Sequence, residues 1–426
     1  MTLTERGQRM GQAEFIALIA MTFATIAFSI DSMLPALPRI GAELSPGDIN
    51  RAQLVLTAFV LGMGLGTFVT GPLSDAFGRK PVIYAGAVIY VIGAFAAWVA
   101  PTLEVMLAAR VVQGLGAAAP RVVSLAIMRD LYSGRVMARM MSIAMMVFAI
   151  FPAFAPLLGT GIIVLVGWRG IFLGFVLFTL IAVLWLGLRL REPLPVPARR
   201  PFRPALLVAA ARELMLHKMV RLTIIVQGLC LGMIFTMITM VQQVYDVIFL
   251  RAESFPFWFA TIAIISASAS LVNAVIVVRF GMRRITTWAL GLEGLWTLAV
   301  MVLVLVSALP DRLMFPLFLL FQASVFLTAG MTIGNLNAMA MEPMGHIAGM
   351  AASVIGALST VMAAVIAAPI GLLFDGTLRP MVGGILIMAA GGFLLMLRIR
   401  VIERREGRRP GGGSGGDAGG GSAPVA

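Results

Sequence analysis

The sequence predicts an all-α polytopic membrane protein, with twelve transmembrane helices in two pseudo-symmetric halves of six. Its 426 residues are 60% hydrophobic and only 12% charged, and the mean hydropathy is +1.00. A soluble domain of this length has a far more charged surface. The apolar residues fall in blocks of about 20, which at 1.5 Å per residue cross a hydrocarbon core of about 30 Å. A short motif also recurs after the second span of each half.

Continuous apolar runs favour helices over a barrel. In lipid, only helices and closed barrels satisfy every backbone polar group, and barrel strands alternate polar with apolar residues. We therefore predict twelve spans, at residues 14–37, 51–72, 81–101, 104–128, 137–161, 166–188, 219–243, 255–279, 285–308, 312–338, 346–371 and 379–398.

An internal repeat relates the two halves. FGRK (77–80) follows the second span, FGMRR (280–284) follows the eighth, and Gly281 lies 203 residues after Gly78. The first and seventh spans start about the same distance apart, which indicates a parallel repeat of six spans. The Gly/Ser-rich end of the chain is expected to be disordered. The predicted parts are a cytoplasmic N-tail (1–13), an N-terminal six-helix half (14–188), a cytoplasmic linker rich in Pro and Arg (189–218), a C-terminal six-helix half (219–398) and a disordered cytoplasmic tail (399–426).

The Lys and Arg residues predict the orientation. With the N-terminus in the cytoplasm, 24 of the 32 fall in or beside cytoplasmic segments, six fall on the other side, and Arg110 and Arg121 lie within the fourth span. The positive-inside rule then places both termini in the cytoplasm. The same rule accounts for the net charge of +13, so we expect no nucleic-acid partner. The lone Cys230 excludes a disulfide framework.

GPLSDAFGRKP (71–81) carries the sharpest pattern in the chain. Gly71 and Gly78 permit close packing and a tight turn. Asp75 places a carboxylate at a helix end, where Arg79 and Lys80 can pair with it. The positive-inside rule alone would account for the two cations, but not for the glycines or the carboxylate. The stretch closely resembles the signature of the major facilitator superfamily, which lies between its second and third helices.

In that family the Asp engages the neighbouring Arg and the start of helix 11, and so holds the cytoplasmic gate shut. The resemblance therefore implies that Asp75 binds Arg79 and the start of the eleventh span, near His346 to Gly349. The helix part of this role has a physical basis, because an anion is favoured at a helix N-terminus.

Two further stretches resemble motifs of the same family. ARVVQGLGAAAP (109–120) is similar to its fourth-helix motif, an Arg followed by Gln-Gly-x-Gly. Depth alone would also allow Arg110 to snorkel to the outer interface. APLLG (155–159) is similar to the antiporter signature Gly-Pro-x-x-Gly of the fifth helix, with the first Gly missing. Pro156 and Gly159 are expected to kink that helix, although proline kinks are also common in ordinary membrane spans.

Four stretches narrow the resemblance to the bicyclomycin and chloramphenicol resistance group (Bcr/CflA type) of drug:proton antiporters. They are AIMRDLY (126–132), ARMMS (138–142), NLNAMAMEPMGHIAGMAAS (335–353) and DSMLPALPRI (31–40), in which Met33 stands where that group usually has Tyr.

This likeness implies a proton-coupled secondary transporter of a bacterial inner membrane, which exports small amphipathic or apolar compounds by alternating access. We expect a monomer in the lipid bilayer, with the proton gradient as its energy source and no cofactor. A proton-coupled importer of a small metabolite on the same fold is the alternative. An intramembrane enzyme is not expected, because one Cys, two distant His and no HExxH motif leave neither a nucleophile–base pair nor a metal cluster.

Asp31 interrupts a run that carries no other charge between Phe15 and Pro38. Asp31 and Arg110 both lie about seven residues, or roughly 10 Å, inside the outer surface. The first and fourth helices pack in one half of this fold, so the resemblance implies that the two side chains face each other across the cavity. Burial favours a protonated carboxyl and a nearby Arg favours an ionised one, so Asp31 suits a proton carrier. A permanent structural ion pair, or a cap on irregular backbone, is the alternative.

The candidate substrate residues lie on the first, fourth, seventh and tenth spans, which line the cavity in the family. Amides and aromatic rings suit an amphipathic ligand, although Gln and Asn can equally join helices. Glu293 in the ninth span is expected to be structural, with a second proton site as the alternative. The candidates are Phe28, Gln113, Gln227, Phe235, Asn335 and Asn337.

Overall fold

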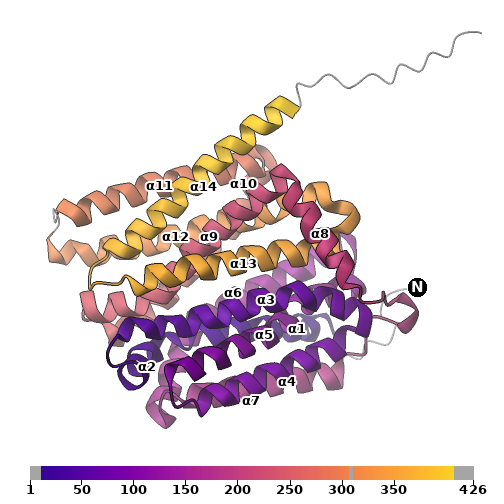
Figure 1. Cartoon of the computed structure of the whole chain (residues 1–426), viewed down its shortest axis with the longest axis horizontal. Coiled ribbons are helices and arrows are strands. Elements are labelled where there is room, and N and C mark those ends of the chain that lie inside the picture. The colour runs from indigo at the N-terminus through magenta and orange to yellow at the C-terminus, as the bar shows by residue number, and fades with distance from the viewer. Residues whose placement is uncertain (1–10, 307–309, 407–426) are drawn as a thin grey trace, which may run out of the picture.

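The computed structural model describes residues 11–306 and 310–406. Within these ranges the chain forms long helices that run side by side, and no strand (Figure 1). The main helices are α1 (Gln12–Asp31), α2 (Leu37–Leu44), α3 (Leu54–Phe77), α4 (Arg79–Trp98), α5 (Leu103–Leu131), α6 (Gly134–Val166), α7 (Gly170–Arg189), α8 (Pro204–Leu216), α9 (Lys218–Gln243), α10 (Phe255–Phe280), α11 (Met282–Val306), α12 (Asp311–Met341), α13 (Ala348–Leu372) and α14 (Arg379–Glu406).

The predicted fold class is confirmed. Over the described residues, ten stretches are long and apolar enough to cross a membrane, and one of them, Arg312–Leu372, contains both α12 and α13. The shorter apolar segment Phe151–Val166 belongs to α6. Each of the twelve predicted spans therefore coincides with one long helix, and the chain is a multi-pass membrane protein.

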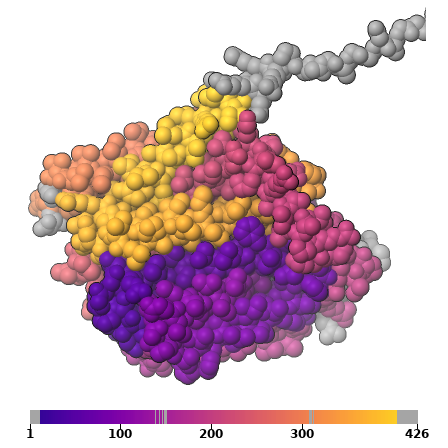
Figure 2. Space-filling model, viewed as in Figure 1, coloured from indigo at the N-terminus to yellow at the C-terminus, as the bar shows by residue number. Residues whose placement is uncertain are grey.

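The helices gather into two bundles that follow the order of the chain. Figure 1 shows α1 and α3–α7 in the lower part of the view and α9–α14 in the upper part, and Figure 2 shows the same boundary on the surface. The bundles meet along two seams, α3 against α13 and α6 against α10. These are the second span with the eleventh and the fifth with the eighth. If the two halves are exchanged, the second span takes the place of the eighth and the eleventh takes the place of the fifth. One seam then becomes the other, as expected for a six-span repeat.

The first span differs from its prediction, because α1 ends at Asp31 whereas the predicted span runs to residue 37. The chain turns at Ser32 and Met33, forms a short 3-10 helix (Leu34–Ala36) and continues as α2. Pro35 has no N–H to donate to the Asp31 carbonyl, so the helical bonding cannot continue. The carboxylate therefore sits on the last residue of a broken helix, within an apolar stretch that extends from Gln12 to Leu44.

The linker and the tail contain more helix than the sequence indicated. The predicted linker (189–218) contains α8, whose Ala210 and Leu214 are buried against α9 and α13. Helix α14 extends to Glu406, so the first residues of the predicted disordered tail are helical, and 407–426 lie outside the described residues. A single apolar face on α8 is sufficient to dock it, because α9 and α13 offer matching apolar surface.

Candidate functional site

Asp31 is buried within the N-terminal half, with 5% of its surface exposed. Its carboxylate has neither a hydrogen bond nor an ion pair with any residue that the structure describes. Helix α6 approaches this point closely, because a Cβ built on Gly159 would overlap the carbonyl oxygen of Ser32. Gly159 and Pro156 of the fifth-span motif thus lie on an unbroken α6 that packs directly beside the proton-carrier candidate. A larger side chain at Gly159 would push the two helices apart.

Arg110 of α5 is fully buried and binds three acceptors. Its Nε donates to the Val55 carbonyl at 3.1 Å, its Nη1 to Gln113 Oε1 at 2.7 Å, and its Nη2 to the Ser29 carbonyl at 2.9 Å. Ser29 lies in the last turn of α1, where carbonyls lack an intrahelical donor and a cation is favoured. The predicted Asp31–Arg110 pair is therefore not made in this conformation, because Arg110 binds the Ser29 and Val55 carbonyls and the Gln113 side chain instead.

A tyrosine that the sequence did not single out completes this network. Tyr90 of α4 is buried, and its hydroxyl lies 2.5 Å from the Ser29 hydroxyl. Ser29 thereby connects α4 and α5 to the end of α1. Nothing in an apolar span distinguishes such a tyrosine from one that faces lipid, so only the packing reveals it.

The structure brings Asp75 and Arg79 of GPLSDAFGRKP together at the α3–α4 turn. Gly78 has φ 103°, a backbone conformation that residues other than glycine rarely adopt. The buried Arg79 donates from Nη1 to Asp75 Oδ1 at 2.6 Å, and from Nε to Asp130 Oδ2 at 2.7 Å. Asp130, in AIMRDLY, was not predicted as part of the site, although a carboxylate at the end of the fourth span was a readable signal.

The linker is anchored to the same turn. Glu192 accepts hydrogen bonds from the backbone N–H groups of Arg79 and Lys80, at 2.8 and 2.9 Å, and so caps the start of α4. The Lys80 ammonium donates to the carbonyls of Gly187 and Leu190 at the end of α7. Lys80 therefore joins the third and sixth spans rather than pairing with Asp75.

The predicted contact of Asp75 with the start of the eleventh span is not made here. Asp75 and Gly349, near the start of α13, line the same cavity instead. His346, just before α13, is bound by Glu213 of α8, with 2.8 Å between His346 Nε2 and the carboxylate. In this conformation α8, in the linker, therefore binds the start of the eleventh span, which the resemblance predicts as the partner of Asp75.

That cavity has a volume of about 340 Å³ and lies between the halves, at the end that carries the α3–α4 turn. Its walls come from α3 and α5 on one side and from α9, α12 and α13 on the other. Asp75 and Arg129 line it and are accessible to solvent, so it reaches the surface at this end. The volume suits a small ligand, since such sites span about 300–1,000 Å³.

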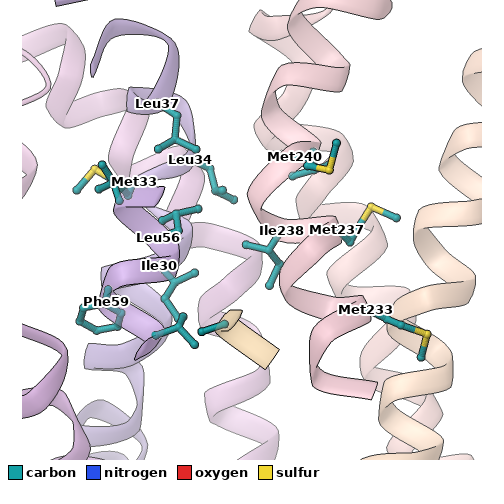
Figure 3. Close-up of a cluster of buried hydrophobic side chains, with 14 of the residues drawn as sticks. Ile30, Met33, Leu34, Leu37, Leu56, Phe59, Met233, Met237, Ile238 and Met240 are labelled. Carbon is teal, nitrogen blue, oxygen red and sulfur yellow. The ribbon is translucent and has the colours of Figure 1, made fainter. Parts of the chain in front are cut away.

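The opposite end is closed by contacts between the halves. Gln53, in a 3-10 helix (Ile49–Gln53) before α3, donates to Gln243 at the end of α9. Asn50 Nδ2 donates to the Phe374 carbonyl at 2.7 Å. Apolar side chains of both halves belong to one buried cluster behind these bonds. Figure 3 shows residues of α1, of the turn that follows it, of α2 and of α3 on one side, and residues of α9 on the other. The labelled residues are Ile30, Met33, Leu34, Leu37, Leu56 and Phe59, and Met233, Met237, Ile238 and Met240.

Comparison with known proteins decides the family. The family model described as Major Facilitator Superfamily matches residues 17–367. The chain belongs to this superfamily. It is 27% identical to the bicyclomycin resistance protein homolog of Haemophilus influenzae, over 86% of this chain and 91% of that protein. It is 33% identical to a chloramphenicol resistance protein of Pseudomonas aeruginosa, over 42% of this chain and 43% of that protein.

Solved structures support the same fold. The partially occluded, inward-open xylose transporter XylE of Escherichia coli aligns with a TM-score of 0.69 and 12% identity, over 92% of this chain and 97% of that one. As a member of the major facilitator superfamily, this chain is a transporter and not an enzyme.

Two of the six candidate substrate residues line the cavity of this superfamily member. Gln227 of α9 is buried, and its side-chain oxygen has no hydrogen-bond donor among the described residues. Asn337 of α12 is exposed to the cavity. Both belong to the wall that the C-terminal half forms. The prediction of cavity residues was therefore more successful for the C-terminal half than for the N-terminal half.

The other four candidates do not line this cavity, and three of them are engaged within a bundle. The Phe28 ring packs on Phe175 and Phe178 of α7, with centroid distances of 5.3 and 5.2 Å. Asn335 forms amide hydrogen bonds with Asn273 of α10. It therefore joins two helices, which was the alternative role expected for Gln and Asn. Gln113 binds Arg110, and Phe235 lines only a narrow gap among α3, α9 and α13.

Glu293 is buried in the C-terminal half, between α11 and α12. Its carboxylate accepts hydrogen bonds from three hydroxyls, those of Thr297 and Ser324 at 3.3 and 3.2 Å and of Thr328 at 3.0 Å. The hydroxyls satisfy the carboxylate locally, which favours the structural role expected for it.

Proposed function

We propose that this protein is a proton-coupled secondary transporter of a bacterial inner membrane, which exports small amphipathic, drug-like compounds by alternating access. It works as a monomer, both termini lie in the cytoplasm, and the proton gradient supplies the energy. The observation that carries the proposal is the cavity between the halves, which reaches the surface at one end and is closed at the other. Relatives named for bicyclomycin and chloramphenicol resistance support the class of substrate.

Asp31 supports the proton coupling. A buried carboxylate without a cation partner is expensive in a membrane and is most easily tolerated when it binds a proton. Asp31 lies beside the closed end, on the helix that carries part of the apolar cluster, with Ile30 next to it. Separation of the halves at this end would expose the carboxylate to the far side of the membrane, where it can take up a proton.

The proposal is tested by expressing the gene in a bacterial host that lacks its own drug pumps. We expect raised resistance to several amphipathic drugs, and, in inside-out vesicles, drug accumulation that a proton ionophore abolishes. If no drug is exported and proton-driven uptake of a metabolite is found instead, the transporter is an importer.

Alternating access also predicts the effect of a cross-link at the closed end. In a Cys230→Ala background, Gln53→Cys with Gln243→Cys joined by a short dithiol-reactive linker should reduce transport to background, because the halves can no longer separate there. Reductive cleavage of a disulfide-forming linker should restore it. The matched control is Arg51→Cys with Glu104→Cys, an ion pair of 2.8 Å at the same end but within one half. Transport that survives the first cross-link would contradict alternating access about this closure.

A further inference from the structure

The charges on the cavity walls do not balance. Arg79 binds both Asp75 and Asp130, so the two carboxylates that line the cavity are already engaged. Arg121 and Arg129 also line it. Neither of them has a hydrogen bond or an ion pair with any residue in the described ranges. The cavity therefore carries more positive charge than its own side chains neutralise.

Arg121 is the deeper of the two unpaired cations. It lies on α5, three turns beyond Arg110 and two turns before Arg129, inside an apolar span. Arg129 is exposed, so water and salt screen its charge, whereas Arg121 is half-buried. A cation inside a membrane protein normally has a partner or marks the path of a substrate. We therefore expect a ligand in the cavity to supply the anion that pairs with Arg121.

The remaining wall is apolar, with a few uncharged polar groups. Val122, Leu125 and Ile333 supply the apolar surface. On the C-terminal side, the side chains of Gln227 and Asn337 add amide groups. The arrangement has one cation for an acidic group, an apolar middle and amides on the opposite wall.

We propose that Arg121 binds the acidic group of the substrate, so that the transported compounds include amphipathic organic anions such as aromatic carboxylates or sulfonates. The guanidinium pairs with the anion through charge-assisted hydrogen bonds while the apolar wall receives the ring system. This inference rests on the proposed transport function, but it concerns substrate selection and not proton coupling.

Equilibrium binding of two dyes that share a xanthene ring system tests it. Purified protein in detergent is titrated with fluorescein, an anion, and with tetramethylrhodamine methyl ester, a cation, and binding is followed by fluorescence polarisation. Arg121→Gln should weaken fluorescein binding about tenfold or more, the effect of losing a charge-assisted hydrogen bond. Arg121→Lys should retain part of the affinity, and tetramethylrhodamine binding should be unchanged or tighter. Arg39→Gln, an exposed cation on α2 outside the cavity, is the control and should bind both dyes like the wild type.

Three results would overturn the inference. The first is that the wild type does not bind fluorescein, and the second is that Arg121→Gln binds fluorescein with the affinity of the wild type. The third is that Arg121→Gln and Arg121→Lys both lose affinity for the two dyes equally, which would show a structural role. Proton-driven export of tetramethylrhodamine from cells is measured separately. If that export persists while fluorescein binding is independent of Arg121, the substrate inference fails and the transport function stands. If neither dye nor any drug is exported, the transport function fails whatever the binding shows.

Discussion

Asp31→Asn is expected to abolish proton-driven export, while the substrate can still cross the membrane down its own concentration gradient. The amide has nearly the shape of the carboxyl but cannot take up or release a proton, so the halves can still rock without coupling. Asp31 is buried, lies on the last residue of α1 and has no cation partner in the described part of the chain. We expect accumulation in inside-out vesicles to stop responding to an imposed pH gradient and to fall to the level of vesicles without the protein.

Glu293→Gln is the matched control for this experiment. It removes the other deeply buried carboxylate discussed above, which three hydroxyls already satisfy, and should leave the response to the pH gradient intact. Full coupling in Asp31→Asn would show that Asp31 is not the carrier. Lost coupling in Glu293→Gln alone would move the proton site to the C-terminal half.

Arg110→Lys unfolds or inactivates the transporter, even though it keeps the positive charge. Arg110 reaches acceptors on three helices, and its guanidinium carbon also lies 4.4 Å from the centre of the Phe59 ring. A lysine ammonium is a point charge and cannot span acceptors held in this fork geometry. The loss of one or two charge-assisted bonds in a buried site is worth about 2–4 kcal/mol, so the midpoint of thermal unfolding in detergent should fall clearly.

Arg51→Lys provides the comparison. Arg51 pairs with Glu104 at 2.8 Å, but both side chains are exposed, and such a pair contributes about 0–1 kcal/mol. Its unfolding midpoint and transport should stay close to those of the wild type. If Arg110→Lys behaves in the same way, the bonds that Arg110 makes to α1, α3 and Gln113 do not stabilise the fold.

The sequence by itself determined the fold class and the family. Apolar blocks of membrane-spanning length leave the backbone few choices, so twelve helices followed from composition and spacing. GPLSDAFGRKP marked the turn at Gly78, because positive φ and close packing require particular residues at particular positions. The association of Asp75 with Arg79 was readable for the same reason, since the two residues are four positions apart on either side of this turn.

Only the tertiary structure decided which polar side chains face the cavity and which join helices. Gln227 faces the cavity whereas Gln113 and Asn335 bond within the bundles, although all three are amides on cavity-lining spans of the family. Arg110 binds the Ser29 carbonyl at the end of α1 instead of Asp31, because Pro35 ends that helix early and leaves carbonyls free. Inside a membrane most polar groups have a partner, and many partners come from helices distant in sequence. A linear pattern therefore shows that a polar group is present but not what it binds.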